Sequence, residues 1–274
     1  MKVSKAERGR VEAVGEVAQV LANAAVAAEG YFRLDLDAPR IAAASGPGQF
    51  VMVRCGDGLL PLLRRPISVA SLDGRRLSLV VRAVGPGTEW MRNRQPGDRV
   101  DLLGPLGNRF SQPRGRTALL VGGGIGVPPM LSLAEGLARE GYGGAVTAFV
   151  GGRTAGDLVL VEELAAAGAE VITATEDGSA GVRGLITEPL AERLASGVGD
   201  AKLYGCGPEG MLASLARLAG EHDLPCEISL EAHMACGLGA CLGCAHQTAA
   251  GGLVHVCSEG PVFDAELIYG GGER

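Results

Sequence analysis

The sequence predicts an antiparallel β-barrel, followed by a doubly wound parallel-sheet α/β domain and a small cysteine-rich C-terminal module. Three observations predict this architecture. Short β-patterned runs alternate with glycine and proline turns up to about residue 112, and strand and helix patterns alternate from there to about residue 222. Four of the seven cysteines then fall within the last 40 residues. A chain of 274 residues is long enough for this division, which we place at residues 1–113, 114–222 and 223–274.

The first segment has several short runs rich in β-branched and apolar residues, separated by Gly-Pro and Asp-Gly turns, and this pattern is typical of a barrel. The expected strands are Tyr31–Asp37, Gln49–Cys55, Ile67–Ala70, Leu77–Val84 and Arg99–Leu103. The mostly apolar stretch Val17–Ala28 is shorter than the roughly 20 residues of a membrane helix and is interrupted by Gln19 and Asn23. We therefore expect neither a membrane span nor a signal peptide.

The second segment alternates apolar runs with helical patterns, which indicates a parallel sheet with helices on both faces. The expected strands are residues 117–121, 145–150, 170–174 and 202–204. The expected helices are residues 128–140, 157–166, 186–195 and 208–220. Beyond about residue 223 the sequence predicts only short, irregular structure.

Charge and cysteine content narrow the functional class. The net charge of −6 argues against nucleic-acid binding, which would favour a clustered basic surface. We expect a soluble, cytoplasmic protein, and thiols stay reduced in that compartment. Cysteines crowded near one end of such a chain therefore indicate a metal centre rather than disulfides.

The C-terminal cysteines have the spacing C-x4-C-x2-C-x12-C, which matches the plant-type pattern of a [2Fe–2S] cluster. The predicted ligands are Cys236, Cys241, Cys244 and Cys257. Small residues between them let the backbone approach a cluster, and their amides can donate to its sulfurs. A four-thiolate zinc site is the alternative, although zinc sites usually pair two C-x2-C knuckles. A Rieske-type centre would need histidine ligands, and the spacing of His233, His246 and His255 from the cysteines does not form the necessary pairs.

Two arginine-bearing segments of the predicted barrel indicate a phosphate-binding site. Arg65-Pro-Ile-Ser68 begins one strand, and Val80-Val-Arg82 ends the next, just before Gly85-Pro-Gly-Thr88. Arginines on neighbouring strands, together with a glycine turn, can hold a pyrophosphate by bidentate contacts and backbone amides. Each segment alone has a simpler explanation as a strand entrance or a turn.

A second phosphate loop is predicted at Gly122-Gly-Gly-Ile-Gly126, between an apolar strand and a helix that starts at Pro128. Val127 occupies the place of the last glycine of the dinucleotide fingerprint, and no Gly-Lys-Ser/Thr follows, which excludes a P-loop. An ordinary strand-to-helix turn is the alternative. Cys206-Gly-Pro208 ends a later strand, at the sheet edge where open parallel sheets bind ligands, and it favours the binding interpretation.

The motifs Arg-Pro-x-Ser, Gly-x-Gly-Thr, Gly-Gly-x-Gly-x-x-Pro and Cys-Gly-Pro occur in this order, and the order resembles the ferredoxin–NADP reductase superfamily. The tail segments 234–244 and 256–264 are more narrowly similar to the electron-transfer subunits of bacterial NAD-dependent dihydroorotate dehydrogenases. The resemblance runs from about Val11 to Leu267. Gly260-Pro-Val-Phe-Asp264 favours this family over other flavin and iron–sulfur diaphorase subunits.

The resemblance implies three carriers: FAD in the barrel, NAD at the α/β domain and a [2Fe–2S] cluster in the tail. The implied FAD contacts are Arg65, Pro66, Ile67, Ser68, Val80, Val81, Arg82, Gly87 and Thr88. The expected nucleotide contacts are Gly122, Gly123, Gly124, Gly126, Cys206, Gly207 and Pro208. Arg153 follows the second strand of the α/β domain, where a 2′-phosphate would be recognised, so NADP stays open at this point.

The resemblance also implies a partner and a reaction. The expected partner is an FMN-containing dihydroorotate dehydrogenase catalytic subunit, in a heterotetramer of two copies of each chain. Dihydroorotate would be oxidised on that partner, in pyrimidine biosynthesis, because this chain shows no acid–base or nucleophilic constellation of its own. The alternatives are a diaphorase subunit of a cytoplasmic hydrogenase, a ferredoxin-dependent NAD(P) transhydrogenase, and a zinc-binding interaction module joined to a nucleotide-sensing domain.

Overall fold

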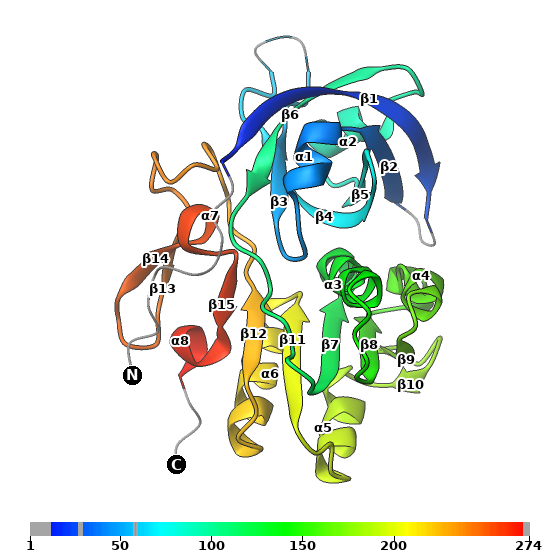
Figure 1. Ribbon diagram of the computed structural model, residues 1–274, viewed down its shortest axis with the longest axis vertical. Coiled ribbons are helices and arrows are strands. Elements are labelled where there is room, and N and C mark those ends of the chain that lie inside the picture. The colour runs from blue at the N-terminus through cyan, green and yellow to red at the C-terminus, as the bar shows by residue number, and fades with distance from the viewer. Residues whose placement is uncertain (1–11, 27–29, 57, 59, 271–274) are drawn as a thin grey trace.

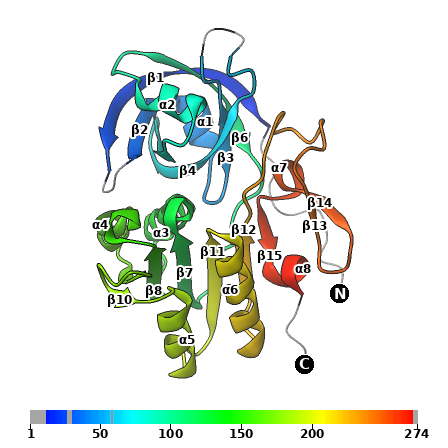
Figure 2. The ribbon, with the colours of Figure 1, turned by 180° about the vertical axis from the view of Figure 1, so that it is seen from behind.

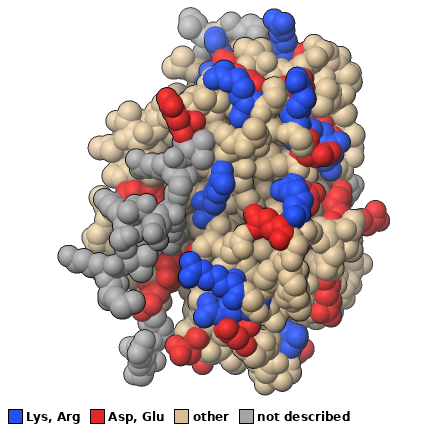
Figure 3. Space-filling model, in the orientation of Figure 1, with Lys and Arg blue, Asp and Glu red and all other residues tan. Residues whose placement is uncertain are grey.

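The computed structural model describes residues 12–26, 30–56, 58 and 60–270. A closed β-barrel lies above a seven-stranded sheet, and the C-terminal segment lies beside both of them (Figures 1 and 2). Among the described residues, no helix combines the length and the apolar character that crossing a membrane requires. On the face shown in Figure 3, Lys and Arg side chains lie interspersed with Asp and Glu side chains.

The barrel has six antiparallel strands in the order β1-β2-β5-β4-β3-β6. Their bounds are β1 Val14–Ala25, β2 Tyr31–Asp37, β3 Phe50–Val53, β4 Arg65–Asp73, β5 Arg76–Arg82 and β6 Arg99–Leu106. Two short helices, α1 Pro39–Ala44 and α2 Pro86–Arg92, connect them. All five predicted strands are confirmed: β2 has the predicted bounds, and the other four have shifted ends.

Strand β1 is the barrel strand that the sequence analysis did not assign. It contains most of the apolar stretch Val17–Ala28, whose last two residues lie outside the described ones. Ala18 and Val20 point into the barrel core, whereas Val17 and Leu21 are exposed, as a half-buried strand requires. Because β1 pairs with both β2 and β6, it closes the barrel.

The α/β domain is built on a sheet of order β10-β9-β8-β7-β11-β12-β15, in which β15 alone is antiparallel to its neighbour. The strands are β7 Thr117–Gly123, β8 Val146–Gly152, β9 Glu170–Thr175, β10 Val182–Arg183 and β11 Ala201–Cys206. The helices are α3 Val127–Arg139, α4 Val161–Ala166, α5 Thr187–Ala195 and α6 Glu209–Glu221, with 3-10 turns η1 Gly124–Gly126 and η2 Ala155–Asp157. Helix α4 starts later than predicted because Leu160 adopts a left-handed conformation (φ 60°) that a helix cannot continue through.

Helices cover both faces of the sheet, as predicted for a doubly wound domain (Figures 1 and 2). Successive residues of β7 point to opposite faces. Leu119 and Val121 pack in the core that includes α5 and α6, whereas Leu120 packs in the core that includes α3 and α4. This two-sided burial explains why the strand is apolar throughout.

The C-terminal segment is more regular than the sequence predicts. Its elements are β12 Cys226–Ser229, β13 Ala245–Gln247, β14 Leu253–His255, α7 Val256–Glu259, β15 Val262–Asp264 and α8 Ala265–Tyr269. Strand β12 pairs in parallel with β11, and β15 pairs with β12, so the segment extends the sheet of the α/β domain. These strands have only three or four residues each, too few for a sequence pattern to reveal.

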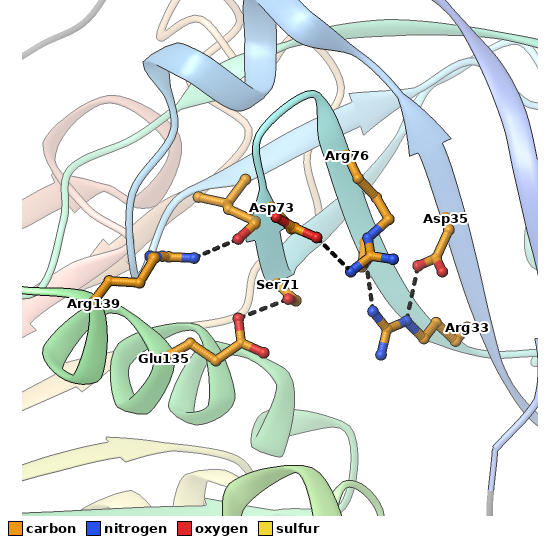
Figure 4. Close-up of polar contacts among 9 residues, drawn as sticks. Arg33, Asp35, Ser71, Asp73, Arg76, Glu135 and Arg139 are labelled. Carbon is orange, nitrogen blue, oxygen red and sulfur yellow. Dashed lines mark hydrogen bonds and ion pairs between the residues drawn. The ribbon is translucent and has the colours of Figure 1, made fainter. Parts of the chain in front are cut away.

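Helix α3 holds the barrel onto the α/β domain (Figure 4). Ser71 Oγ of β4 donates a 2.6 Å hydrogen bond to Glu135 Oε2 of α3. Arg139 donates to the carbonyl of Leu72. A Cβ at Gly136 would lie 2.9 Å from Cγ of Pro47, so this glycine permits the close approach. These contacts between β4 and α3 hold the barrel so that Arg82, at the end of β5, lies near Gly123 and Gly124 after β7.

Candidate functional site

The two arginine-bearing segments of the barrel meet at one end of a strand pair. Strand β4 begins at Arg65 and pairs antiparallel with β5, which ends at Arg82. Arg65 lies against the turn that opens α2: a Cβ at Gly87 would lie 2.9 Å from Arg65 Nε. Arg65 Nη1 also donates a 2.6 Å hydrogen bond to the carbonyl of Leu63. Two cations and a glycine turn thus converge, which is the arrangement predicted for a pyrophosphate.

The Thr88 hydroxyl is used within the turn. It accepts hydrogen bonds from the amides of Val84 (2.9 Å) and Gly85 (3.1 Å). It donates back to the Gly85 carbonyl at 3.0 Å. In this conformation Thr88 fixes the shape of the turn beside Arg65.

A cavity of about 570 Å³ opens at the carboxyl ends of the parallel strands. The predicted residues Gly123, Gly124, Gly207 and Pro208 line it, as does Arg82 from the barrel. Both predicted nucleotide loops therefore reach one cavity. The cavity lies between the α/β domain and the barrel, which contributes Tyr31 and Arg82 to its lining.

The other predicted loop residues lie behind the cavity wall, where their small size allows the loops to pack. A Cβ at Gly126 would lie 2.2 Å from the carbonyl oxygen of Cys206. A Cβ at Gly122 would lie 2.9 Å from Cγ2 of Val127. Cys206 is fully buried, and burial raises the pKa of its thiol. These three residues shape the cavity wall and are absent from the cavity lining.

Arg153, which the sequence placed near a possible 2′-phosphate, lines the cavity, and several of its neighbours were not predicted. Asp157 and Glu176 follow β8 and β9 at the same sheet edge as Gly123, where open parallel sheets bind ligands, so their position after these strands could have revealed them. Tyr31 and Glu231 come from outside the α/β motifs, and their sequence context gives no such signal. Burial raises the pKa of the Glu231 carboxyl.

Hydrogen bonds join the loop after β8, which carries Arg153 and Asp157, to the loop after β9, which carries Glu176. The amide of Glu176 donates to the Gly152 carbonyl at 3.1 Å, and the amide of Asp177 donates to the Arg153 carbonyl at 3.1 Å. Ser179 Oγ accepts a 2.7 Å hydrogen bond from the Ala155 amide. The polar end of the cavity is therefore formed by loops that hold each other in place.

The four predicted cysteine ligands lie in one loop and one short helix. Cys244 Sγ is 3.2 Å from Cys257 Sγ. The Cys241 amide donates to Cys236 Sγ at 3.4 Å. The structure thus places the Cys244 and Cys257 sulfurs in contact and Cys241 beside Cys236, while no three metal-ligating side chains of the described residues are grouped closely enough to hold one metal ion.

Backbone amides surround these sulfurs, as the glycine-rich sequence predicts. The Leu238 amide donates to Cys236 Sγ at 3.3 Å, and the Gly239 amide donates to Cys257 Sγ at 3.2 Å. Gly237 and Gly239 have φ values of 71° and 79°, which other residues rarely adopt. A Cβ at Gly237 would lie 2.7 Å from Cγ of Met52. The loop is therefore wound tightly and packed against the barrel.

The sulfurs differ in their affinity for protons. The amide of Leu238, assisted by those of Cys241 and Ala240 and by the Cys241 side chain, lowers the pKa of Cys236 to about 6. Burial, followed by the nearby Cys244, raises the pKa of Cys257 to about 12. Thiolates are the form that ligates iron, so these amides favour ligation at Cys236.

Comparison with known proteins decides the family. Residues 231–269, which contain all four cysteines, match the model of the iron–sulfur cluster binding domain of dihydroorotate dehydrogenase B. Residues 120–217 match the oxidoreductase NAD-binding domain. An electron transfer subunit of dihydroorotate dehydrogenase B (NAD(+)) from Desulforamulus reducens is 41% identical over 90% of this chain and 95% of its own. The chain belongs to this family.

Other members support the assignment. The corresponding subunit of Geobacillus thermodenitrificans is 39% identical over 92% of this chain and 98% of its own length. The iron–sulfur match favours the cluster over the zinc alternative, because it covers the segment for which zinc was considered. Membership of this family identifies the chain as an oxidoreductase subunit with an iron–sulfur cluster binding domain and an NAD-binding domain.

Solved structures show the same fold. A NADH-dependent reduced ferredoxin-NADP oxidoreductase, described for flavin-based electron bifurcation, aligns with a TM-score of 0.81 and 28% identity, covering 92% of this chain and 90% of that one. A ferredoxin reductase of carbazole 1,9a-dioxygenase aligns with a TM-score of 0.68 and 26% identity, covering 79% of this chain and 68% of that one. The predicted combination of barrel and α/β domain is confirmed by these reductases.

Proposed function

We propose that this chain carries electrons from the FMN of a dihydroorotate dehydrogenase catalytic subunit, through its own [2Fe–2S] cluster and FAD, to NAD⁺, in pyrimidine (UMP) biosynthesis. The support comes from relatives of about 40% identity that carry this name. The observation that carries it in the structure is the position of the cysteine loop. Gly237 packs on Met52 of β3, and Met52 pairs directly with Pro66 of the Arg65–Ser68 segment. The cluster loop therefore lies one strand from the proposed flavin segment.

The chain's own residues have distinct roles in this proposal. Cys236, Cys241, Cys244 and Cys257 hold the cluster, and the amides of Leu238 and Gly239 stabilise their negative charge. Arg65 and Arg82 neutralise the pyrophosphate of FAD. A flavin at this position supplies the exchange between one-electron and two-electron transfer. The Gly123–Gly124 and Gly207–Pro208 loops bind the nicotinamide dinucleotide.

The cavity also favours NAD over NADP. Arg153 is the cation that the sequence analysis associated with a 2′-phosphate. Its Nε lies 4.0 Å from Asp157 Oδ2, and Glu176 lines the same cavity. A 2′-phosphate near Arg153 would therefore also face two carboxylates, whereas a ribose hydroxyl can donate to them.

The partner surface includes the cysteine loop. Leu238 and Leu242 flank the cysteines and are 55% and 57% exposed. Exposed apolar side chains next to an electron-transfer centre suit a protein interface, whose core is depleted of charge. We infer a heterotetramer of two catalytic and two electron-transfer chains. Cysteines that must stay reduced to hold a cluster suit the reducing cytoplasm, where we place the complex.

A transhydrogenase subunit is the second candidate. It is favoured by the 0.81 TM-score to the ferredoxin-NADP oxidoreductase. Its partner would supply electrons from ferredoxin rather than from dihydroorotate. Co-purification followed by a dihydroorotate-dependent NAD⁺ assay distinguishes the two.

The substitution Cys257→Ser tests the proposed electron route. In the variant, NADH should still reduce a dye through FAD, because the nucleotide cavity contains none of the cluster ligands. Dihydroorotate-dependent NAD⁺ reduction with the catalytic subunit should fall at least 100-fold, since thiolates are the cluster ligands and a hydroxyl replaces one. Iron and acid-labile sulfide assays report the loss of the cluster.

Cys226→Ala is the matched control, because Cys226 is a buried cysteine of β12 outside the ligand set. It should keep iron, sulfide and both activities. Full coupled activity in a Cys257→Ser protein without iron would refute the route. Loss of NADH–dye activity while FAD stays bound would do the same.

A further inference from the structure

Tyr31 is the side chain of the cavity wall whose polar group the structure leaves unused. It begins β2, is 3% exposed, and lines the cavity from the barrel side. Its hydroxyl makes no hydrogen bond to any described residue. A buried hydroxyl without a partner is costly, and native proteins rarely keep one unless a ligand or water completes it. Its place in the cavity wall points to a ligand.

The ring of Tyr31 is held firmly. The guanidinium carbon of Arg82, its cross-strand neighbour, lies 5.3 Å from the ring centroid. At the hydroxyl end of the ring, a Cβ at Gly124 would lie 3.7 Å from the Tyr31 hydroxyl oxygen. The hydroxyl is therefore aimed across the seam between the domains, at the first turn after β7.

Asp157 faces the same space from the α/β domain. It ends the η2 turn, lines the cavity, and its side chain is 14% exposed. Burial raises the pKa of Tyr31, the Arg82 guanidinium opposes this rise, and the nearby Asp157 carboxylate adds to it; the net shift is upward, so the phenol stays protonated as a donor. The boundary between the barrel and the α/β domain thus carries a hydroxyl donor, Tyr31, next to a carboxylate acceptor, Asp157.

We propose that Tyr31 and Asp157 together bind a ribose hydroxyl of the nicotinamide dinucleotide, bridging the barrel and the α/β domain. A sugar hydroxyl both accepts and donates, so it satisfies the phenol and the carboxylate at once. A phosphate only accepts, and it would be repelled by Asp157. The inference rests on the proposed use of this cavity for NAD.

The test is a calorimetric titration of NAD⁺ into FAD-loaded protein, together with a melting curve of the free protein. Tyr31→Phe should weaken NAD⁺ binding about 3- to 10-fold, the usual effect of one lost hydrogen bond. Its melting temperature should not fall, since the lost hydroxyl had no protein partner. FAD content should stay at the wild-type value. Asp157→Asn should also weaken binding, and the double variant should be less impaired than the product of the two single effects.

Tyr142→Phe is the matched control. The Tyr142 hydroxyl is likewise buried without a partner among the described residues, but it does not line the cavity. Its removal should leave NAD⁺ affinity unchanged.

Unchanged NAD⁺ affinity in Tyr31→Phe would overturn the inference, as would loss of FAD with normal NAD⁺ binding. A fall in melting temperature with normal NAD⁺ affinity would also overturn it, by assigning the hydroxyl a structural role. If the wild-type protein itself binds no NAD⁺, the proposed function fails instead, so the two failures are distinguishable.

Discussion

Arg65, which we propose binds FAD, is held in place by the chain itself before any ligand binds. Its guanidinium is anchored by the Leu63 carbonyl and packs on Gly87, so its position is set by the chain itself. Little side-chain entropy then remains to be lost when a pyrophosphate binds. The contribution of this residue should therefore appear directly in FAD affinity.

Arg65→Ala should weaken FAD binding about 10- to 150-fold, the equivalent of a charge-assisted contact of roughly 1.5–3 kcal/mol. Flavin absorbance after gel filtration, followed by titration with FAD, measures the change. The iron content should be unaffected, because no cysteine ligand contacts Arg65. Arg92→Ala is the control: Arg92, in the last turn of α2, forms an exposed ion pair with Glu89, so FAD should be retained. Equal FAD retention in both variants would contradict the assignment.

At the level of elements, the cavity depends on two strand-to-helix loops packed backbone to backbone. Gly126 ends η1 and contacts the Cys206–Gly207 backbone at the end of β11. Neither loop can move aside, because each is continuous with a central strand of the sheet and these two strands pair with each other. The shape of the cavity therefore depends on residue 126 being a glycine, without a side chain.

Gly126→Ala should disrupt the cavity, because its Cβ would lie 2.2 Å from the Cys206 carbonyl oxygen and 2.6 Å from the Gly207 amide nitrogen, both of them backbone atoms. We expect NAD⁺ affinity to fall at least 10-fold while FAD and iron remain bound. The KM for NADH in the dye assay and a calorimetric titration with NAD⁺ measure this. Gly210→Ala is the control, since Gly210 also lines the cavity but a Cβ there meets nothing within 4 Å. Normal NAD⁺ binding in Gly126→Ala would show that the loops are more compliant than the packing indicates.

At the scale of the whole molecule, a buried polar cluster fixes the segment that links the barrel to the α/β domain. Ser111 in this linker donates to both carboxylate oxygens of Glu227 on β12, through its amide (2.9 Å) and its hydroxyl (2.8 Å). Lys202 Nζ of β11 lies 3.2 Å from Glu227 Oε1, and both side chains are less than 10% exposed. Tyr204 Oη donates to the Ser111 carbonyl at 2.7 Å. The linker is therefore held to the sheet.

Glu227→Gln should destabilise the protein by about 3–5 kcal/mol, because it removes the carboxylate that faces the buried Lys202 ammonium. A melting curve should show a decrease of about 10 °C at this chain length. Combining it with Lys202→Met should recover much of the loss. Asp200→Asn, which breaks an exposed pair with Arg116, should cost less than about 1 kcal/mol. Equal effects of Glu227→Gln and Asp200→Asn would mean that the buried pair does not secure the linker.

The sequence by itself determined the order of barrel, α/β domain and cysteine module, because glycine turns, strand–helix periodicity and cysteine spacing are local patterns. It also located the two glycine loops that reach the cavity and the set of four cysteines, because each is defined by residues close together in the chain. Only the tertiary structure decided that β1 closes the barrel and that three-residue β15 completes the sheet, since both depend on distant pairing partners. For the same reason it alone placed Tyr31 opposite Asp157 in one cavity: the two residues are far apart in the sequence and belong to different domains, and only the docking of those domains brings them together.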